Sequence, residues 1–173
     1  MEQVILVDEL DNELGVMEKI LAHQKALLHR AFSIFIFNDK GELLLQQRAL
    51  SKYHSPGLWT NTCCSHPRPA ESSSDAANRR LKEEMGFECE LTYQFNFIYK
   101  AELDQGLTEH ELDHVFFGLY TGLVNPNPEE VKDYKFVDVK EVLFDMDANP
   151  EKYTVWFKII FNKVNQVRNG NSN

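Results

Sequence analysis

Two adjacent cysteines and a histidine occur within one short stretch, residues 60–67, which reads TNTCCSHP. Thiols and imidazoles are the side chains that most often act as nucleophiles, proton donors or ligands of transition metals. Cys63, Cys64 and His66 could therefore form a disulfide, a metal-binding knuckle or a reactive thiol. They could equally be packing residues, since a free cysteine is ordinarily buried and inert. The rest of the chain has to decide among these alternatives.

A second group of candidates lies in the segment EHELDH, residues 109–114. In a strand, Glu109 and Glu111 point to one face of the sheet, and His110 and His114 point to the other. The two carboxylates can therefore act together. The two histidines are not expected to share a site with them.

A third group lies in residues 73–85, whose apolar positions Ala77, Leu81 and Met85 predict a helix that begins after serine and aspartate caps and stops at Gly86. Arg79 and Arg80 lie four residues before Glu83 and Glu84, so each pair shares a helix face. Taken alone, the pattern is typical of a solvated surface helix with ion pairs.

Residues 65–87 also resemble the Nudix box, in which Gly, Glu, Arg-Glu, Glu-Glu and Gly recur at fixed spacing. Ser65 stands where the box has its first Gly, and Arg80 stands where it has the Glu of Arg-Glu. The resemblance implies a Nudix-like α/β/α sandwich. In Nudix hydrolases the replaced Glu helps to hold the ions that activate water, so Arg80 counts against hydrolysis. The matching residues are Glu71, Arg79, Leu81, Glu83, Glu84, Gly86 and Phe87.

The cysteine loop and both departures resemble one branch of that superfamily, the type I isopentenyl-diphosphate isomerases. The likeness covers about residues 3–160 and also rests on the segments HRAFS (29–33), RALSK (48–52), PGLW (56–59) and EHE (109–111). It implies that Cys64 is the catalytic thiol and that Cys63 is a packing residue.

The same resemblance implies the remaining site residues. Glu111 would be the second acid–base group, and Tyr99 would hydrogen-bond near it. The implied ligands of Mn²⁺, Zn²⁺ or Mg²⁺ are His23, His29, His66, Glu109 and Glu111. The implied diphosphate contacts are Lys19, Arg48, Lys52 and Arg80, with Glu84 holding a Mg²⁺ on the diphosphate and Trp156 facing the carbon skeleton.

The implied reaction moves a double bond in a small isoprenoid diphosphate. Protonation of an alkene produces a tertiary carbocation, and a second group must then remove a proton, so two acid–base groups are needed on opposite faces of the substrate. A Nudix-type diphosphate hydrolase and a non-catalytic binding domain are the competing interpretations.

Composition restricts the class of partner. The chain has 173 residues, a formal charge of −9, three cysteines and 43% hydrophobic residues. The sequence lacks the basic stripe that would predict nucleic-acid binding. No apolar run reaches the roughly 20 residues of a membrane span. The odd cysteine count and the absence of a signal-peptide pattern favour a cytoplasmic protein. We expect one domain over residues 1–173, with a frayed tail at 169–173, and a monomer, with a homodimer as the alternative.

The elements that must position these residues follow from local patterns. Strands are expected at residues 4–7, 31–37, 42–48, 90–101, 114–120 and 131–137, and helices at 73–85, 139–144 and 154–167. Residues 49–72 are expected to be irregular because of their prolines and Gly57. This mixture of elements predicts an α/β sandwich with mixed sheets.

Overall fold

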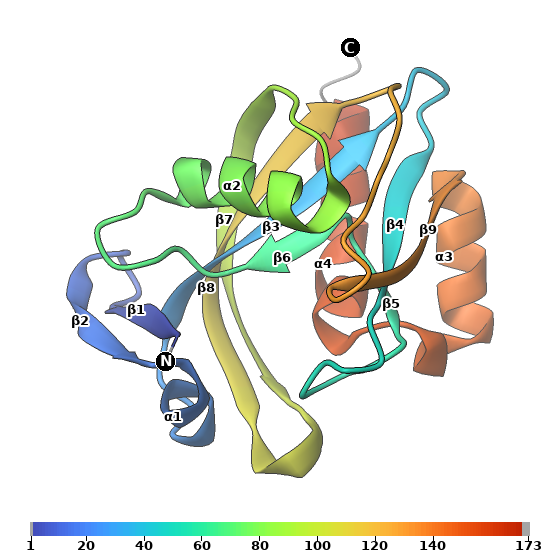
Figure 1. Cartoon of the computed structure of the whole chain (residues 1–173). Coiled ribbons are helices and arrows are strands. Elements are labelled where there is room, and N and C mark those ends of the chain that lie inside the picture. The colour runs from blue at the N-terminus through green and yellow to red at the C-terminus, as the bar shows by residue number, and fades with distance from the viewer. Residues whose placement is uncertain (1, 171–173) are drawn as a thin grey trace.

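The computed structural model describes residues 2–170 of the chain, which form a mixed sheet with helices on both sides (Figure 1). The elements in chain order are β1 (Gln3–Val7), β2 (Glu13–Glu18), α1 (Lys19–Gln24), β3 (His29–Phe37), β4 (Leu43–Arg48), β5 (Trp59–Thr60), β6 (Cys63–Ser65), α2 (Ser73–Met85), β7 (Leu91–Glu102), β8 (Thr108–Leu119), β9 (Val131–Val137), α3 (Val139–Ala148) and α4 (Val155–Gly170). Short 3₁₀ turns lie at Asp104–Gly106 and Pro150–Lys152.

Strand β3 is the centre of the sheet. It pairs in parallel with β8 along its whole length, from His29 opposite Glu111 to Phe37 opposite Leu119. On its other side β3 pairs antiparallel with β6, and its ends contact β1 and β4. The antiparallel strand β7 extends the sheet beyond β8, and β9 and β5 flank β4.

The two faces of β3 bury different helices because side chains alternate along a strand. Ile34 and Ile36 pack with Leu81 and Met85 of α2 in one core cluster. Phe35 lies in a second cluster, which contains the buried sides of α3 and α4. The α/β/α sandwich with mixed pairing that the sequence predicts is therefore confirmed.

Helix α2 has the bounds predicted from the sequence, and its ends explain why. The Ser72 hydroxyl accepts a hydrogen bond of 3.1 Å from the backbone N–H of Asp75 and so caps the first turn. Gly86 ends the helix in the left-handed conformation, with φ of 76°, and its N–H donates to the carbonyl of Lys82.

The prediction that residues 49–72 are irregular is wrong in part, because β5 and β6 lie within this segment. These strands have two and three residues, too few for an alternating pattern, and exist through pairing with β4 and β3. Strand β8 begins at Thr108, not at residue 114, because its first inward positions carry buried carboxylates that break the apolar pattern.

Several other boundaries differ from the expectation. The hairpin strand β2 and the six-residue α1 were not expected, since β2 buries little of its surface and α1 is too short for a periodic signal. Helices α3 and α4 run on to Ala148 and Gly170. The prediction of a frayed tail is therefore wrong for residues 169 and 170, which belong to α4. Residues 171–173 lie outside the part of the chain that the structure describes.

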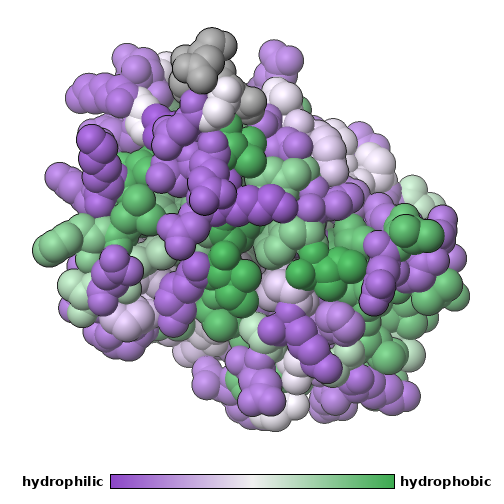
Figure 2. Space-filling view, turned by 180° about the vertical axis from the view of Figure 1, so that it is seen from behind, coloured by the Kyte–Doolittle hydropathy of each residue, from purple (hydrophilic) through white to green (hydrophobic). Residues whose placement is uncertain are grey.

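The surface seen from behind carries hydrophilic side chains with apolar ones between them (Figure 2). Several large apolar residues are well exposed, among them Leu10, Leu14, Leu123 and Phe144. No helix within residues 2–170 is long and apolar enough to cross a membrane.

The turn after α2 provides a test of the fold. An added Cβ at Gly86 would overlap the backbone carbonyl of Asn125, whereas Gly106, with a φ of 72°, has nothing within 4 Å of that position. We expect Gly106→Ala to cost about 1–2 kcal/mol of unfolding free energy through backbone strain alone. Gly86→Ala should cost about 1–3 kcal/mol more, because the neighbouring backbone must shift. Urea unfolding followed by circular dichroism measures both, and equal losses would contradict the role given to the Asn125 contact.

Candidate active site

Strand pairing assigns the two adjacent cysteines to opposite faces of the sheet. In β6, Cys63 lies opposite Ile34 and Cys64 lies opposite Ser33. Cys63 is fully buried in the core cluster under α2, as expected for a packing residue. Cys64 faces the other side and lines a pocket of about 430 Å³. The thiols are therefore not equivalent, although they are neighbours in the chain.

The loop before β6 is held by buried polar side chains. The amide of Asn61 donates to the carbonyls of Cys63 (2.8 Å) and Ile34 (3.2 Å). The hydroxyl of Thr62 donates to the carbonyl of Leu44 at 2.6 Å and accepts from the N–H of Ile36 at 3.0 Å. These bonds fix the orientation of the strand that carries Cys64.

Three imidazoles and one carboxylate meet at the N-terminal end of β3. One ligand atom from each of His23, His29, His66 and Glu111 lies within 4.8 Å of the others. The parallel register places His29 directly beside Glu111, and His66 Nε2 lies 2.9 Å from Glu111 Oε1. Residues from α1, β3, the loop after β6 and β8 therefore converge on one point.

The chemistry of this cluster fits a divalent transition metal. His23 Nδ1 lies 2.8 Å from the backbone carbonyl of Lys19, and His29 Nδ1 lies 2.8 Å from that of Leu27. This contact fixes the ring so that Nε2 carries a lone pair. Both Nε2 atoms are buried and have no hydrogen-bond partner among the described residues. Buried polar atoms are rarely left in this state, so the cluster can hold an ion.

Glu109, the fifth ligand expected from the sequence, is not part of this group of four. The Tyr99 hydroxyl lies 2.7 Å from Glu111 Oε2 and 3.0 Å from Glu109 Oε2, so both carboxylates face the same side, as the alternation predicts. His110 and His114 point elsewhere, to the carbonyl of Ala26 and to Asp11.

The two carboxyl groups differ in their proton affinity. Burial and the nearby charge of Glu111 raise the pKa of Glu109 well above its ordinary value. Burial acts on Glu111 in the same direction, but contacts with His29 and His66 hold its pKa well below its ordinary value. A bound cation would favour the ionised form of both carboxyl groups. On one side of the pocket, two carboxyl groups whose pKa values are shifted in opposite directions are thus joined through one hydroxyl.

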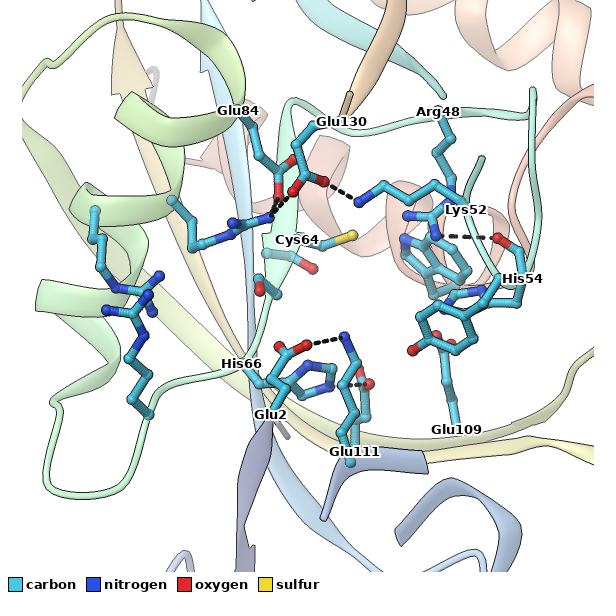
Figure 3. A pocket seen from close by; sticks show the side chains of 18 of the residues that line it. Glu2, Arg48, Lys52, His54, Cys64, His66, Glu84, Glu109, Glu111 and Glu130 are labelled. Carbon is cyan, nitrogen blue, oxygen red and sulfur yellow. Dashed lines mark hydrogen bonds and ion pairs between the residues drawn. The ribbon is translucent and has the colours of Figure 1, made fainter. Parts of the chain in front are cut away.

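The Cys64 thiol is neutral at rest. Burial raises its pKa, Arg48 acts in the opposite direction, and the carboxylates of Glu84, Glu109 and Glu111 reinforce burial. Figure 3 shows Cys64 between the carboxylates of Glu84 and Glu130 on one side and His66 with Glu111 on the other.

The far end of the pocket is cationic. Arg48, Lys52 and Arg80 line it, whereas Lys19 lines the pocket near the histidines and pairs with Glu2 at 3.1 Å. The Arg80 guanidinium contacts Glu84 at 2.5 Å and Glu130 at 3.2 Å, and Lys52 pairs with Glu130. Glu84 belongs to this end and not to the histidine cluster, and its second oxygen accepts from Gln46 at 2.9 Å.

An aromatic wall connects the two ends. Trp156 is 3% exposed and lines the pocket from the start of α4. The Arg48 guanidinium lies 5.2 Å from the centre of its ring, and the His54 ring meets it edge-on at 5.6 Å. Burial and the nearby charges of Arg48 and Lys19 lower the pKa of His54 to about 3, so His54 is a neutral wall residue.

The residues expected from the sequence to be catalytic, substrate-binding or metal-binding all line this pocket, except His23 and His29, which are fully buried in the cluster with His66 and Glu111. The structure also adds pocket residues that the sequence did not suggest. Glu130 was missed because it precedes β9 without a motif, and Tyr53 and His54 lie in a loop with no periodic signal. The further additions are Glu2, Gln3, Ser33 and Arg68, and the Nudix-box positions Ser65 and Arg79 also line the pocket.

Comparison with known proteins agrees with the architecture. The family model described as NUDIX domain matches residues 27–157. The fold is similar to that in the crystal structure of DR0079 from Deinococcus radiodurans, with a TM-score of 0.78 at 18% identity, covering 94% of this chain and 98% of that one. The Nudix-like architecture expected from the sequence is thereby confirmed.

The sequence relatives narrow the class further. The chain is 52% identical over 170 residues to isopentenyl-diphosphate Delta-isomerase 2 of Aromatoleum aromaticum, covering 98% of this chain and 90% of the relative. It is 51% identical over 162 residues to isopentenyl-diphosphate Delta-isomerase of Pectobacterium atrosepticum, covering 94% and 90%. The chain therefore belongs to the Nudix superfamily and, within it, to the isopentenyl-diphosphate Delta-isomerase family.

The histidine cluster predicts specific metal retention. We expect protein supplied with Zn²⁺, Mn²⁺ or Mg²⁺ and then passed through a desalting column to retain a divalent ion. His66→Ala should weaken retention at least about tenfold, because it removes one of four converging ligands. His110→Ala, outside the cluster, is the control and should retain the ion. Elemental analysis measures the outcome, and a wild-type protein that holds none of the three metals would contradict the cluster as a metal site.

Proposed function

We propose that this protein interconverts isopentenyl diphosphate and dimethylallyl diphosphate by proton addition and removal on the carbon skeleton. The observation that carries the proposal is that Cys64 and the hydrogen-bonded Tyr99 and Glu111 line one pocket that also has a cationic end. Family membership supports the same reaction, since the relatives over nearly the full chain are named isopentenyl-diphosphate Delta-isomerases.

The acid–base chemistry needs two groups on opposite sides of the substrate. A proton added to the terminal CH₂ of the alkene leaves a tertiary carbocation at the neighbouring carbon. Loss of a proton from the adjacent CH₂ then forms the new double bond. Cys64 and Glu111 are the proposed pair, and each acts as acid in one direction and base in the other. Tyr99, hydrogen-bonded to Glu111, is positioned to relay a proton.

The cation must be kept from water and stabilised. Trp156 supplies a buried aromatic face, which can stabilise a desolvated cation by about 2 kcal/mol. Lys19, Arg48, Lys52 and Arg80 would bind the diphosphate through charge-assisted hydrogen bonds. Arg80 stands where a hydrolase needs a carboxylate, which supports retention of the diphosphate over its cleavage.

Two cations fit the residues present. Zn²⁺, Mn²⁺ or Mg²⁺ held by His23, His29, His66 and Glu111, with Glu109 as a fifth ligand, would fix the Glu111 carboxylate and alter its proton affinity. Mg²⁺ held by Glu84 would neutralise part of the diphosphate charge.

The remaining expectations concern the setting. Cys63, Cys64 and Cys89 are free thiols, which suits a reducing compartment, and we expect the cytoplasm. A single domain that acts as a monomer without nucleic-acid partners remains our prediction.

The reaction can be tested directly by proton NMR with isopentenyl diphosphate and Mg²⁺ in D₂O, with phosphate release followed in the same tube. We expect dimethylallyl diphosphate to appear with incorporated deuterium and without phosphate. Cys64→Ala should abolish the conversion while circular dichroism remains unchanged, and Cys89→Ala, which changes a thiol outside the pocket, should retain it. Phosphate release without isomer would instead support a hydrolase and reduce Cys64 to a structural thiol.

The aromatic wall predicts a graded effect at Trp156. Trp156→Leu should lower kcat about 30-fold, the equivalent of 2 kcal/mol, because the ring no longer faces the cation. Trp156→Phe retains an aromatic face and should lose less. Steady-state kinetics with both variants separates the effects, and equal losses would indicate that Trp156 acts only by filling space.

A further inference from the structure

Glu130 is a carboxylate at the cationic end of the pocket to which the reaction gives no role. Its side chain extends between Lys52 and Arg80 and pairs with both (Figure 3). The backbone beneath it is fixed, because its carbonyl accepts from the N–H of Ala49 at 3.0 Å and its N–H donates to Asn127 at 3.0 Å. The contact with two cations is therefore built into the turn before β9.

These ion pairs neutralise two of the four cations expected to bind the diphosphate. Arg80 also contacts Glu83 at 2.8 Å and Glu84 at 2.5 Å, so Lys52 and Arg80 together face three carboxylates. Arg48 differs, since within residues 2–170 it has no carboxylate partner and donates to the carbonyl of His54. A diphosphate that uses Lys52 and Arg80 must take the place of Glu130 or lie beside its negative charge.

Such competition has a use in this reaction. Substrate and product carry the same diphosphate, so phosphate contacts bind both equally and do not lower the barrier between them. Very tight contacts would only slow product release. A carboxylate that competes for the same cations keeps this uniform binding moderate.

We propose that Glu130 is an internal counter-ion that holds Lys52 and Arg80 in the ligand-free protein and is exchanged for diphosphate oxygens on binding, so that it sets the affinity of the pocket for the diphosphate group. The inference rests on the proposed function, since it takes the cationic end as the diphosphate site. It concerns the binding step alone, and it predicts that removal of this charge strengthens binding.

The test is calorimetric titration with inorganic pyrophosphate in excess Mg²⁺. Glu130→Gln should bind about tenfold more tightly than wild type, because a like charge is removed from the site while the side chain keeps its size. The control is Glu129→Gln, which removes the same charge from an exposed neighbour and should bind within about twofold of wild type. With isopentenyl diphosphate, Glu130→Gln should lower KM.

The opposite results are equally clear. Unchanged or weaker binding by Glu130→Gln would overturn the counter-ion role and would point to Glu130 as a positioning residue or cation ligand. Equal tightening in Glu129→Gln would overturn it too, because net charge would then explain the effect. Absence of pyrophosphate binding in wild type and variant alike would overturn the diphosphate site itself.

A second variant at the same position tests the proposal independently, in case Glu130→Gln does not fold correctly. Glu130→Asp keeps the charge but is one methylene shorter, so it cannot reach both cations as Glu130 does. It should bind pyrophosphate more tightly than wild type and less tightly than Glu130→Gln. Affinity equal to or below that of wild type would contradict the exchange, and thermal unfolding without ligand checks that each variant is folded.

Discussion

The site depends on the parallel pairing of β3 with β8. This register places His29 beside Glu111 and continues to Phe37 beside Leu119. A slip of one residue would turn every inward side chain of either strand to the opposite face. Burial of apolar side chains opposes such a slip, because Phe35 and Val115 on the same face are fully buried in the cluster that contains α4. Apolar burial at one end of the strand pair thus fixes the ligand geometry at the other.

A buried cluster of three histidines and a carboxylate is costly to maintain. Removal of charged and polar groups from water is unfavourable unless each finds a partner. Here the outer nitrogens of His23 and His29 meet backbone carbonyls, and the Glu111 carboxylate meets His66 and Tyr99. Within residues 2–170 the Nε2 atoms of His23 and His29 make no hydrogen bond, and His29 Nε2 lies 3.5 Å from Glu111 Oε1. The local destabilisation is therefore concentrated where an ion would relieve it.

The pocket separates two kinds of electrostatic environment. Near the histidines, burial keeps the Cys64 thiol neutral and raises the pKa of Glu109, whereas Glu111 stays ionised. At the other end, carboxylates lie against Lys52 and Arg80 and form ion pairs with them. The histidine–carboxyl cluster and the ion pairs of Lys52 and Arg80 thus lie at different ends of one cavity, which Cys64 and the Trp156 ring also line. A single replacement in the Nudix pattern, Arg80 for a carboxylate, supplies part of the cationic end.

Local sequence determined much of the fold, and its motifs suggested most residues of the candidate site. Helix α2 and strand β9 have the predicted bounds, since a serine cap, a terminal glycine and regular apolar spacing act within one element. The motifs around Cys64, Arg80 and Glu111 identified the family. Tertiary structure alone decided which groups meet. Residues that lie far apart in the chain, such as His29 and Glu111, become neighbours only through strand pairing. The short strands β5 and β6 and the ion pairs of Glu130 likewise arise from partners distant in sequence, whose contacts leave no periodic signal in the chain.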